Sequence, residues 1–167
     1  MPPMKNNKVV LITGCSSGIG RKLAILMHER GHKVYAGGRR WESVKTLCDL
    51  GITPVELDVT SSEQCEEALK VILAKEGRID ILVNNAGVGI MGPLIELEDK
   101  QIEEQLAVNV HSVIRMSRVA AQPMIEQRGG LIVNIGSVSG ILVTPFSGIY
   151  GASKAAGEGL LAAYAEG

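Results

Sequence analysis

The segment of residues 8–30 constrains the fold most strongly, because an apolar strand pattern runs directly into a glycine-rich turn and then into a helical pattern. Val9–Ile12 is an uninterrupted apolar run, typical of a strand buried on both faces of a parallel sheet. Gly14, Gly18 and Gly20 follow. Glycine permits unusual backbone angles and close approach of a ligand, and the N–H groups at a helix start favour a phosphate. The segment predicts a cradle for a dinucleotide pyrophosphate; the alternative is an ordinary glycine-rich turn.

Length and composition indicate one globular domain, since the chain has 167 residues, of which 46% are hydrophobic and 21% charged. The formal net charge of −1 gives no indication of a nucleic acid or an anionic membrane surface as partner. No apolar run approaches the ~20 residues that span a bilayer. Cys15, Cys48 and Cys65 show neither metal-binding nor disulfide spacing. We therefore expect a cytoplasmic protein with reduced thiols and no resident metal.

Short apolar strand patterns alternate with helical patterns along the chain. This alternation predicts βαβ units with right-handed crossovers, and so a doubly wound parallel sheet in a three-layer, Rossmann-like α/β fold. The ligand crevice of such a sheet lies at the carboxyl ends of the strands, where the strand order reverses. We expect strands at residues 8–13, 33–36, 53–57, 79–83 and 131–135, and helices at residues 18–29, 41–50, 62–76, 100–128 with a possible break near Asn109, and 150–165.

The residues His28-Glu29-Arg30-Gly31-His32 match a zinc-protease motif by letter. That motif works only when both histidines lie on one face of an unbroken helix. Gly31 falls where the first helix should end, so we expect His32 to lie beyond the helix and both histidines to be solvated.

Two arginines, Arg39 and Arg40, follow the second strand. An NAD-specific site would place an acidic residue here, ~20 residues after the glycine turn, to bind the ribose 2′-hydroxyl. A guanidinium can instead bind a 2′-phosphate through two hydrogen bonds. The pattern predicts a preference for NADP, with Arg39 as the first contact and Arg40 as the second. Two solvated surface arginines are the alternative.

The third and fourth strands also end in residues that can meet a nucleotide. Asp58 and Val59 follow the third strand, where Asp58 could reach an adenine edge. Alternatively, Asp58, Ser61 or Ser62 caps the next helix. The fourth strand runs into Asn84-Asn85-Ala86-Gly87, which taken alone is a tight turn.

Four polar side chains could carry chemistry. Tyr150 and Lys154 are four residues apart, which places them on one helix face, and an ammonium near a phenol stabilises the phenolate. Ser137 follows the fifth strand, where its hydroxyl could donate to a substrate carbonyl or simply be a loop serine. Asn109 interrupts a helical pattern, where it could kink the helix and hold a water or merely be exposed.

The combination of these motifs is more specific than any one of them. Thr13-Gly14-x-x-x-Gly18-Ile19-Gly20, Asn84-Asn85-Ala86-Gly87, Asn109, Ser137 and Tyr150-x-x-x-Lys154 occur together and in this order. On these residues, nearly the whole chain closely resembles the short-chain dehydrogenase/reductases. Within that family, residues 35–40 and 146–156 are most similar to fungal NADPH-dependent 1-acyldihydroxyacetone-phosphate reductases.

The resemblance implies a role for each of these residues. Tyr150 is the general acid in ketone reduction and the base in alcohol oxidation, and Lys154 supports it and binds the nicotinamide ribose. Ser137 orients the carbonyl, and Asn109 anchors a proton-relay water. The nucleotide would be bound by residues along four strand ends: Gly14, Ser16, Ser17, Gly18, Ile19 and Gly20 at the pyrophosphate, Arg39 and then Arg40 at the 2′-phosphate, Asp58 and Val59 at adenine, and Asn85, Ala86 and Gly87 on the adenosine side.

The resemblance thus implies an NADP(H)-dependent oxidoreductase that interconverts a ketone and a secondary alcohol, with a lipid-type substrate such as 1-acyldihydroxyacetone phosphate. It also implies a homo-oligomer and peripheral association with the endoplasmic reticulum or lipid droplets. The chain ends at Gly167, before the last strands of the family pattern. We therefore expect one incomplete domain over residues 1–167, with the fifth strand as an open sheet edge. The alternatives are a catalytically impaired nucleotide-binding fragment and a sugar-nucleotide epimerase, although epimerases usually space their glycines Gly-x-x-Gly-x-x-Gly.

Overall fold

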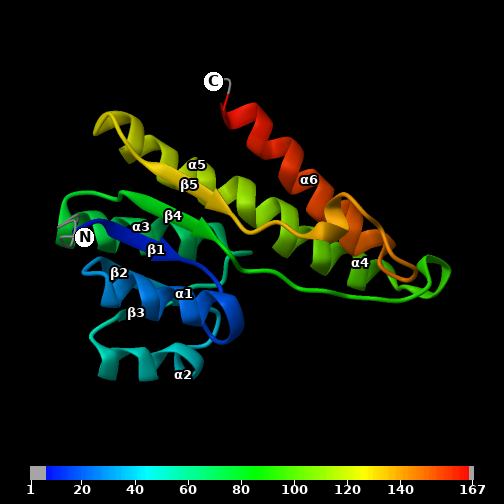
Figure 1. Cartoon of the computed structure of the whole chain (residues 1–167), viewed down its shortest axis with the longest axis horizontal. Coiled ribbons are helices and arrows are strands. Elements are labelled where there is room, and N and C mark those ends of the chain that lie inside the picture. The colour runs from blue at the N-terminus through cyan, green and yellow to red at the C-terminus, as the bar shows by residue number, and fades with distance from the viewer. Residues whose placement is uncertain (1–6, 166–167) are drawn as a thin grey trace. The chain divides into compact units, whose positions relative to one another are not determined.

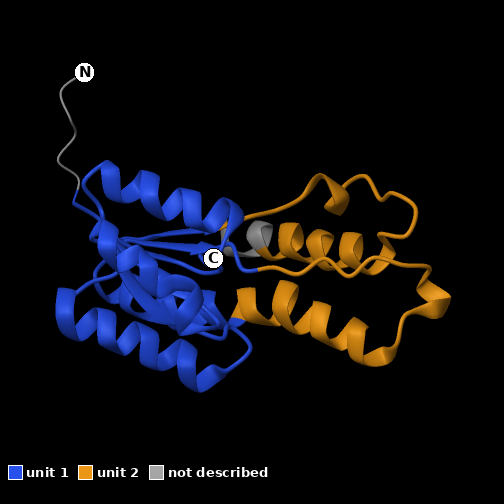
Figure 2. Cartoon of the chain, turned by 90° about the horizontal axis from the view of Figure 1, so that it is seen from below, with its two compact units in different colours: residues 1–86, 115–133 blue, residues 87–114, 134–167 orange. Residues whose placement is uncertain are grey.

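The structure is a computed structural model that describes residues 7–165, with side chains described for residues 7–160. The chain forms two compact units (Figure 2). Unit 1 comprises Met1–Ala86 and Arg115–Val133, and unit 2 comprises Gly87–Ile114 and Asn134–Gly167. Each unit is therefore built from two stretches that are far apart in the sequence.

Unit 1 is organised around a five-stranded sheet with the strand order β3-β2-β1-β4-β5 (Figure 1). The pairs β1–β2, β1–β4 and β2–β3 are parallel. The order reverses at β1, because β2 and β3 extend the sheet on one side and β4 and β5 on the other, so the predicted doubly wound sheet is confirmed. The strands are β1 (Val9–Ile12), β2 (Lys33–Gly38), β3 (Thr53–Glu56), β4 (Ile81–Asn84) and β5 (Leu131–Asn134).

Helices cover both faces of this sheet (Figure 2). They are α1 (Gly18–Glu29), α2 (Trp41–Val44) followed by the 3-10 helix η1 (Lys45–Leu50), α3 (Ser62–Glu76) and most of α5 (Ser112–Glu126). The expected helix at residues 41–50 is therefore one α-turn and a 3-10 helix. Between the layers, Leu11, Leu82, Ile72 and Met116 have no exposed surface; the burial of Leu11 was predicted from the apolar run Val9–Ile12.

Helix α1 ends at Glu29, so His32 lies beyond it, as expected. Gly31 takes a φ of +87°, and its N–H donates to the His28 carbonyl at 2.8 Å. His32 then accepts a hydrogen bond from the Lys8 N–H at its Nδ1, at 3.3 Å. Within residues 7–165, no group of three or more His, Cys, Asp and Glu side chains could hold a metal ion.

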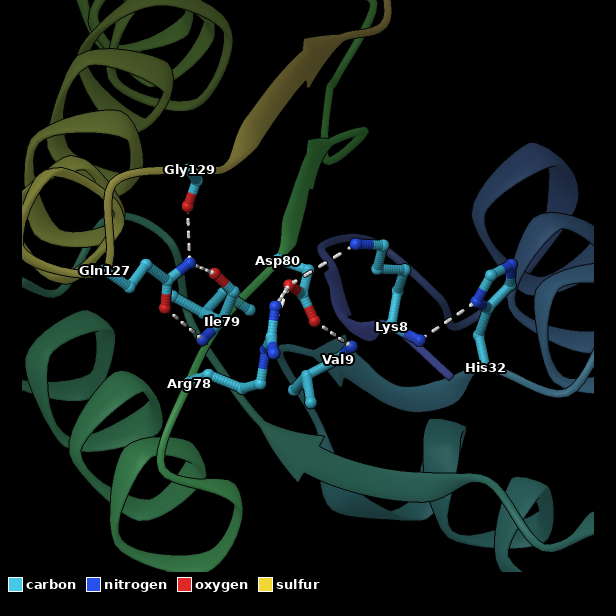
Figure 3. Close-up of polar contacts among 8 residues, drawn as sticks. All are labelled: Lys8, Val9, His32, Arg78, Ile79, Asp80, Gln127 and Gly129. Atoms are coloured by element: carbon cyan, nitrogen blue, oxygen red, sulfur yellow. Dashed lines mark hydrogen bonds and ion pairs between the residues drawn. The ribbon is translucent and has the colours of Figure 1, made fainter. Parts of the chain in front are cut away.

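A buried carboxylate, Asp80, ties the starts of three strands together (Figure 3). It accepts from the Val9 N–H at 2.8 Å and from Arg78 Nε at 3.0 Å, and Lys8 Nζ lies 4.0 Å away. Its backbone accepts from the Leu131 N–H at 2.8 Å. Burial raises the pKa of Asp80, but the hydrogen bonds from Arg78 and Val9 and the two cationic charges outweigh it, so the pKa lies below its ordinary value.

Gln127, which directly follows α5, forms hydrogen bonds with the backbone just before β4 (Figure 3). Its Nε2 donates to the carbonyls of Ile79 at 2.5 Å and Gly129 at 2.6 Å. Its Oε1 accepts from the Ile79 N–H at 3.4 Å. The long α5 helix is thereby aligned with the start of β4.

Unit 2 contains the 3-10 helices η2 (Leu94–Glu96) and η4 (Val138–Gly140), helix α4 (Asp99–Leu106), the π-helical turn η3 (Ala107–His111) and helix α6 (Gly148–Ala165). The expected helix at residues 100–128 is thus α4, a π-turn and α5 in one continuous helical segment. The helix does not break near Asn109; its hydrogen bonding changes there to the π-helical pattern. No helix in the described part of the chain is long and apolar enough to cross a membrane.

Candidate active site

The glycine turn after β1 is built on close backbone contacts within unit 1. Gly14 has a φ of +72°, and a Cβ there would lie 2.7 Å from Ala86 Cα. A Cβ at Gly20 would lie 2.4 Å from the Gly14 carbonyl oxygen. Asn85 Nδ2 donates to the carbonyls of Thr13 at 2.9 Å and Gly14 at 3.0 Å. Only glycine fits the two tight positions, so the turn presents backbone rather than side chains to a ligand.

The start of α1 is suited to a phosphate. Ser17 is the N-cap residue, but its side chain makes no capping hydrogen bond, and the first turn holds no acidic residue. Gly18 has a φ of +57°, and a Cβ there would meet no atom within 4 Å. The exposed turn Ser16–Gly18 and Ile19, which is 65% exposed, therefore leave room for an anion against helix N–H groups. A dinucleotide pyrophosphate fits this cradle.

Cys15 lies in the turn but faces inward. It is fully buried, and its Sγ lies 3.2 Å from the Ile12 carbonyl oxygen, to which it donates. Burial raises the pKa of the thiol to about 12. Cys15 thus fills the turn, where burial disfavours its thiolate.

The arginines after β2 are both exposed. A hollow of about 600 Å³ lies at this end of the sheet, lined by Arg40, Trp41, Glu42, Ser43 and Glu56. Trp41 is 44% exposed and could stack on an adenine. Arg40 lines this hollow, so it stands beside Arg39 as a candidate contact for a 2′-phosphate.

Asp58 is engaged in a local turn at the end of β3. Its Oδ1 accepts from the N–H of Thr60 at 2.9 Å and from its hydroxyl at 2.7 Å. Ser61, one of the expected alternatives, caps α3 by accepting from the Gln64 N–H at 3.2 Å. Val59 is 7% exposed, and its carbonyl accepts a hydrogen bond from Arg115 Nη1 at 2.9 Å.

Unit 2 gathers the four residues proposed for the chemistry. Tyr150 and Lys154 lie in α6, Ser137 is the N-cap of η4, and Asn109 lies in the π-turn. Glycines bring η4 and α6 into contact: a Cβ at Gly151 would lie 2.8 Å from the Ser139 carbonyl oxygen. Because η4 and α6 interlock here, Ser137 is fixed relative to the tyrosine helix.

Hydrogen bonds orient these side chains. Lys154 Nζ donates to the Ile135 carbonyl at 3.0 Å. Ser137 Oγ accepts from the Ser139 N–H at 3.2 Å, which leaves its own proton available. Tyr150 is half-buried, and its backbone carbonyl accepts from Ser153 Oγ at 2.7 Å.

Asn109 is a structural link as well as a site candidate. It is 4% exposed, and its Oδ1 accepts from the Val88 N–H at 2.9 Å. Its Nδ2 donates to the Val88 carbonyl at 2.8 Å and to Ser153 Oγ at 2.9 Å. Both amide protons are therefore used to connect the segment after β4 with α6. Ser153, fully buried between Asn109 and Tyr150, had no recognisable signal of its own in the sequence.

Comparison with known proteins identifies a family model and several relatives that are similar to this chain. The family model described as short chain dehydrogenase matches residues 8–166. A 3-ketodihydrosphingosine reductase of Bacteroides thetaiotaomicron is 37% identical over 153 residues, which are 91% of this chain and 55% of that protein. Human 17-beta-hydroxysteroid dehydrogenase type 1 is 40% identical over 164 residues, which are 91% of this chain and 49% of that protein.

A solved structure agrees with this match. A short-chain dehydrogenase from Streptomyces avermitilis superposes with a TM-score of 0.90 at 34% identity, covering 98% of this chain and 61% of that protein. The chain thus spans about half the length of the two relatives described above. Because the family model covers nearly the whole sequence, the chain belongs to the short-chain dehydrogenase family.

Proposed function

We propose that the chain carries the dinucleotide-binding and catalytic residues of an NADP(H)-dependent oxidoreductase that interconverts a ketone and a secondary alcohol. The observation that carries the proposal is the interlocking of α6 and η4, which fixes Tyr150, Lys154 and Ser137 within one unit. The glycine cradle of unit 1 is a second support, since its backbone fits a pyrophosphate.

Each polar group has a distinct task in ketone reduction. Nicotinamide, when bound, supplies the hydride. The Ser137 hydroxyl donates a hydrogen bond to the carbonyl oxygen, where negative charge develops. Tyr150 gives its phenolic proton to the same oxygen, and alcohol oxidation reverses this transfer.

Lys154 supports Tyr150 through its charge. One of its three protons is used on the Ile135 carbonyl, which leaves two for other acceptors. The ammonium stabilises the phenolate that remains after proton transfer and can bind the nicotinamide ribose. Asn109, whose side chain is committed to Val88 and Ser153, would hold a relay water through its backbone.

Unit 2 also favours an apolar substrate. Two of its segments, residues 91–95 and 138–146, are joined by a hydrogen bond from the Gly92 N–H to the Phe146 carbonyl at 2.8 Å. Both segments expose large apolar side chains, among them Met91, Leu94, Ile95, Val138, Ile141, Leu142, Val143 and Phe146. Exposed apolar surface on this scale is typical of a binding surface, and a lipid-type ketone such as 1-acyldihydroxyacetone phosphate would cover it.

The test combines turnover with binding. NADPH oxidation is followed by its absorbance with 1-acyldihydroxyacetone phosphate, 3-ketodihydrosphingosine and a 17-ketosteroid. We expect turnover with at least one of them, and its loss in Tyr150→Phe while NADPH still binds in a fluorescence titration. NADPH binding without any turnover would instead favour a catalytically impaired nucleotide-binding fragment. Absence of NADPH binding would overturn both.

A further inference from the structure

Gln105 is a polar side chain of α4 with no exposed surface. Its Oε1 accepts from the Ile90 N–H at 2.5 Å, and its Nε2 donates to the Ile90 carbonyl at 3.5 Å. A buried amide destabilises the folded state unless its oxygen and nitrogen are hydrogen-bonded. Within the described residues, both side-chain hydrogen bonds of Gln105 go to the backbone of Ile90, so the amide couples α4 to the segment that contains Ile90.

The side-chain amides of Asn109 and Gln105 both bind the backbone of residues 88–90. Asn109 bonds both the N–H and the carbonyl of Val88, and Gln105 bonds both groups of Ile90. Gln105 and Asn109 are four positions apart on the continuous helical segment formed by α4 and η3, and their partners are two positions apart on the segment after β4. The segment is therefore held like a strand, with side chains in place of a neighbouring strand.

Gly89 lies between the two held residues and faces the candidate catalytic ring. A Cβ built on Gly89 would lie 3.8 Å from both Cδ2 and Cε2 of Tyr150, which is van der Waals contact. The ring therefore lies next to the Gly89 backbone, with room for about one methyl group between them. Movement of this backbone would change the space beside the phenol ring.

We propose that Gln105 is a positioning residue for Tyr150: it fixes the backbone of residues 88–90, which the Tyr150 ring faces. This inference rests on the proposed function, since it assigns the residue that supports the proton donor of that reaction. Asn109 fixes one end of the segment and Gln105 the other. Without Gln105, the next hydrogen bond in the described structure that holds the chain after Gly89 is the one from the Gly92 N–H to the Phe146 carbonyl, three residues on. A displacement of ~1 Å at the phenol is enough to lower turnover on the order of 10²-fold.

The experiment compares Gln105→Leu, Gln105→Glu and a matched control. Gln101 is the control, because it lies one turn earlier on α4 and its Oε1 accepts from the Glu98 N–H at 2.9 Å, within its own helix. Three quantities are measured by NMR and kinetics: the exchange rate of the Ile90 amide, the NOE between the Tyr150 ring and the Gly89 α-protons, and kcat with the best ketone.

In Gln105→Leu we expect faster Ile90 exchange, a weakened NOE and a kcat at least about 10-fold lower, with an unchanged KM for NADPH. Gln105→Glu keeps an acceptor for the Ile90 N–H. Relative to Gln105→Leu, it should restore the protection of the Ile90 amide, the NOE between Tyr150 and Gly89, and part of kcat. This variant also provides the test if Gln105→Leu does not fold. Gln101→Leu should resemble the parent. The NMR readouts do not need turnover, so they decide the role of Gln105 even if the proposed function fails. An unchanged NOE, or a weakened NOE with unchanged kcat, would overturn the proposal.

Discussion

Replacing Asp80 with asparagine should destabilise unit 1 in a way that depends on pH. Asparagine keeps the size of the side chain and one acceptor oxygen, but it loses the charge that Arg78 and the Val9 N–H now contact. Hydrogen bonds to charged groups contribute about 1.5–3 kcal/mol, against about 0.5–1.5 for neutral ones. The bond from the Val9 N–H is buried, but the contributions of Arg78 and Lys8 are discounted because their side chains are 53% and 40% exposed, so the loss is about 1–2 kcal/mol. The melting temperature should fall by roughly 2–8 °C.

The pH dependence follows from the direction of the pKa shift. The pKa of Asp80 is lowered in the folded state, so its contribution is present above the unfolded value, about 3.9, and is lost as pH falls through the folded pKa. The difference between parent and Asp80→Asn should therefore narrow below about pH 4.

Denaturation followed by circular dichroism, from pH 7 downward, measures both effects. Glu67→Gln is the control, because Glu67 is 63% exposed, pairs with Lys70 at 3.7 Å on the helix surface, and should contribute less than about 1 kcal/mol. Equal stability of parent and Asp80→Asn at pH 7, or a difference that stays constant into acid, would refute the reasoning.

Three further predictions concern the dinucleotide site and the thiols. Gly14 and Gly77 both have positive φ, but only at Gly14 would a Cβ clash, since one at Gly77 would meet no atom within 4 Å. Gly14→Ala should therefore lower the free energy of unfolding in urea more than Gly77→Ala does, and only Gly14→Ala should weaken NADPH binding. Paired serine replacements of Arg39 and Arg40 should weaken NADPH binding at least about 10-fold and leave NADH binding nearly unchanged in fluorescence titrations; equal losses for the two cofactors would remove the NADP assignment. A thiol reagent should modify the exposed Cys48 rapidly in the native protein. Burial raises the pKa of Cys15 to about 12 and that of Cys65 to about 11, so these two thiols should react only on unfolding. Rapid modification of more than one thiol in the native protein would contradict this.

Local patterns were sufficient for the main features of the fold. The apolar run of β1 predicted a fully buried strand, and the glycine after α1 predicted that His32 lies outside the helix. Asn109 predicted an irregularity in the helix because asparagine disfavours a helix interior; the structure has a π-turn there, within a helical segment that does not break. These features depend on residues that are close in sequence.

The contacts that hold the site together could not be predicted in this way. Asp80 meets the Val9 N–H across 71 residues of sequence, and Asn109 meets Ser153 across 44. Gln105 is an ordinary residue for a helix, and only the tertiary structure shows that its amide binds the backbone of Ile90. Such partners are chosen by the packing of distant segments, which leaves no periodic signal in the sequence.

The central proposal is that a hydride passes between a dinucleotide and a carbonyl whose oxygen is protonated by Tyr150. The most direct measurement incubates the protein with a ketone and NADPH that is dideuterated at C4 of the nicotinamide, and follows the alcohol by mass spectrometry. We predict an alcohol with one deuterium on the carbinol carbon, formed by the parent protein and not by Tyr150→Phe. An alcohol without deuterium, or equal formation of the deuterated alcohol by Tyr150→Phe, would contradict the proposal.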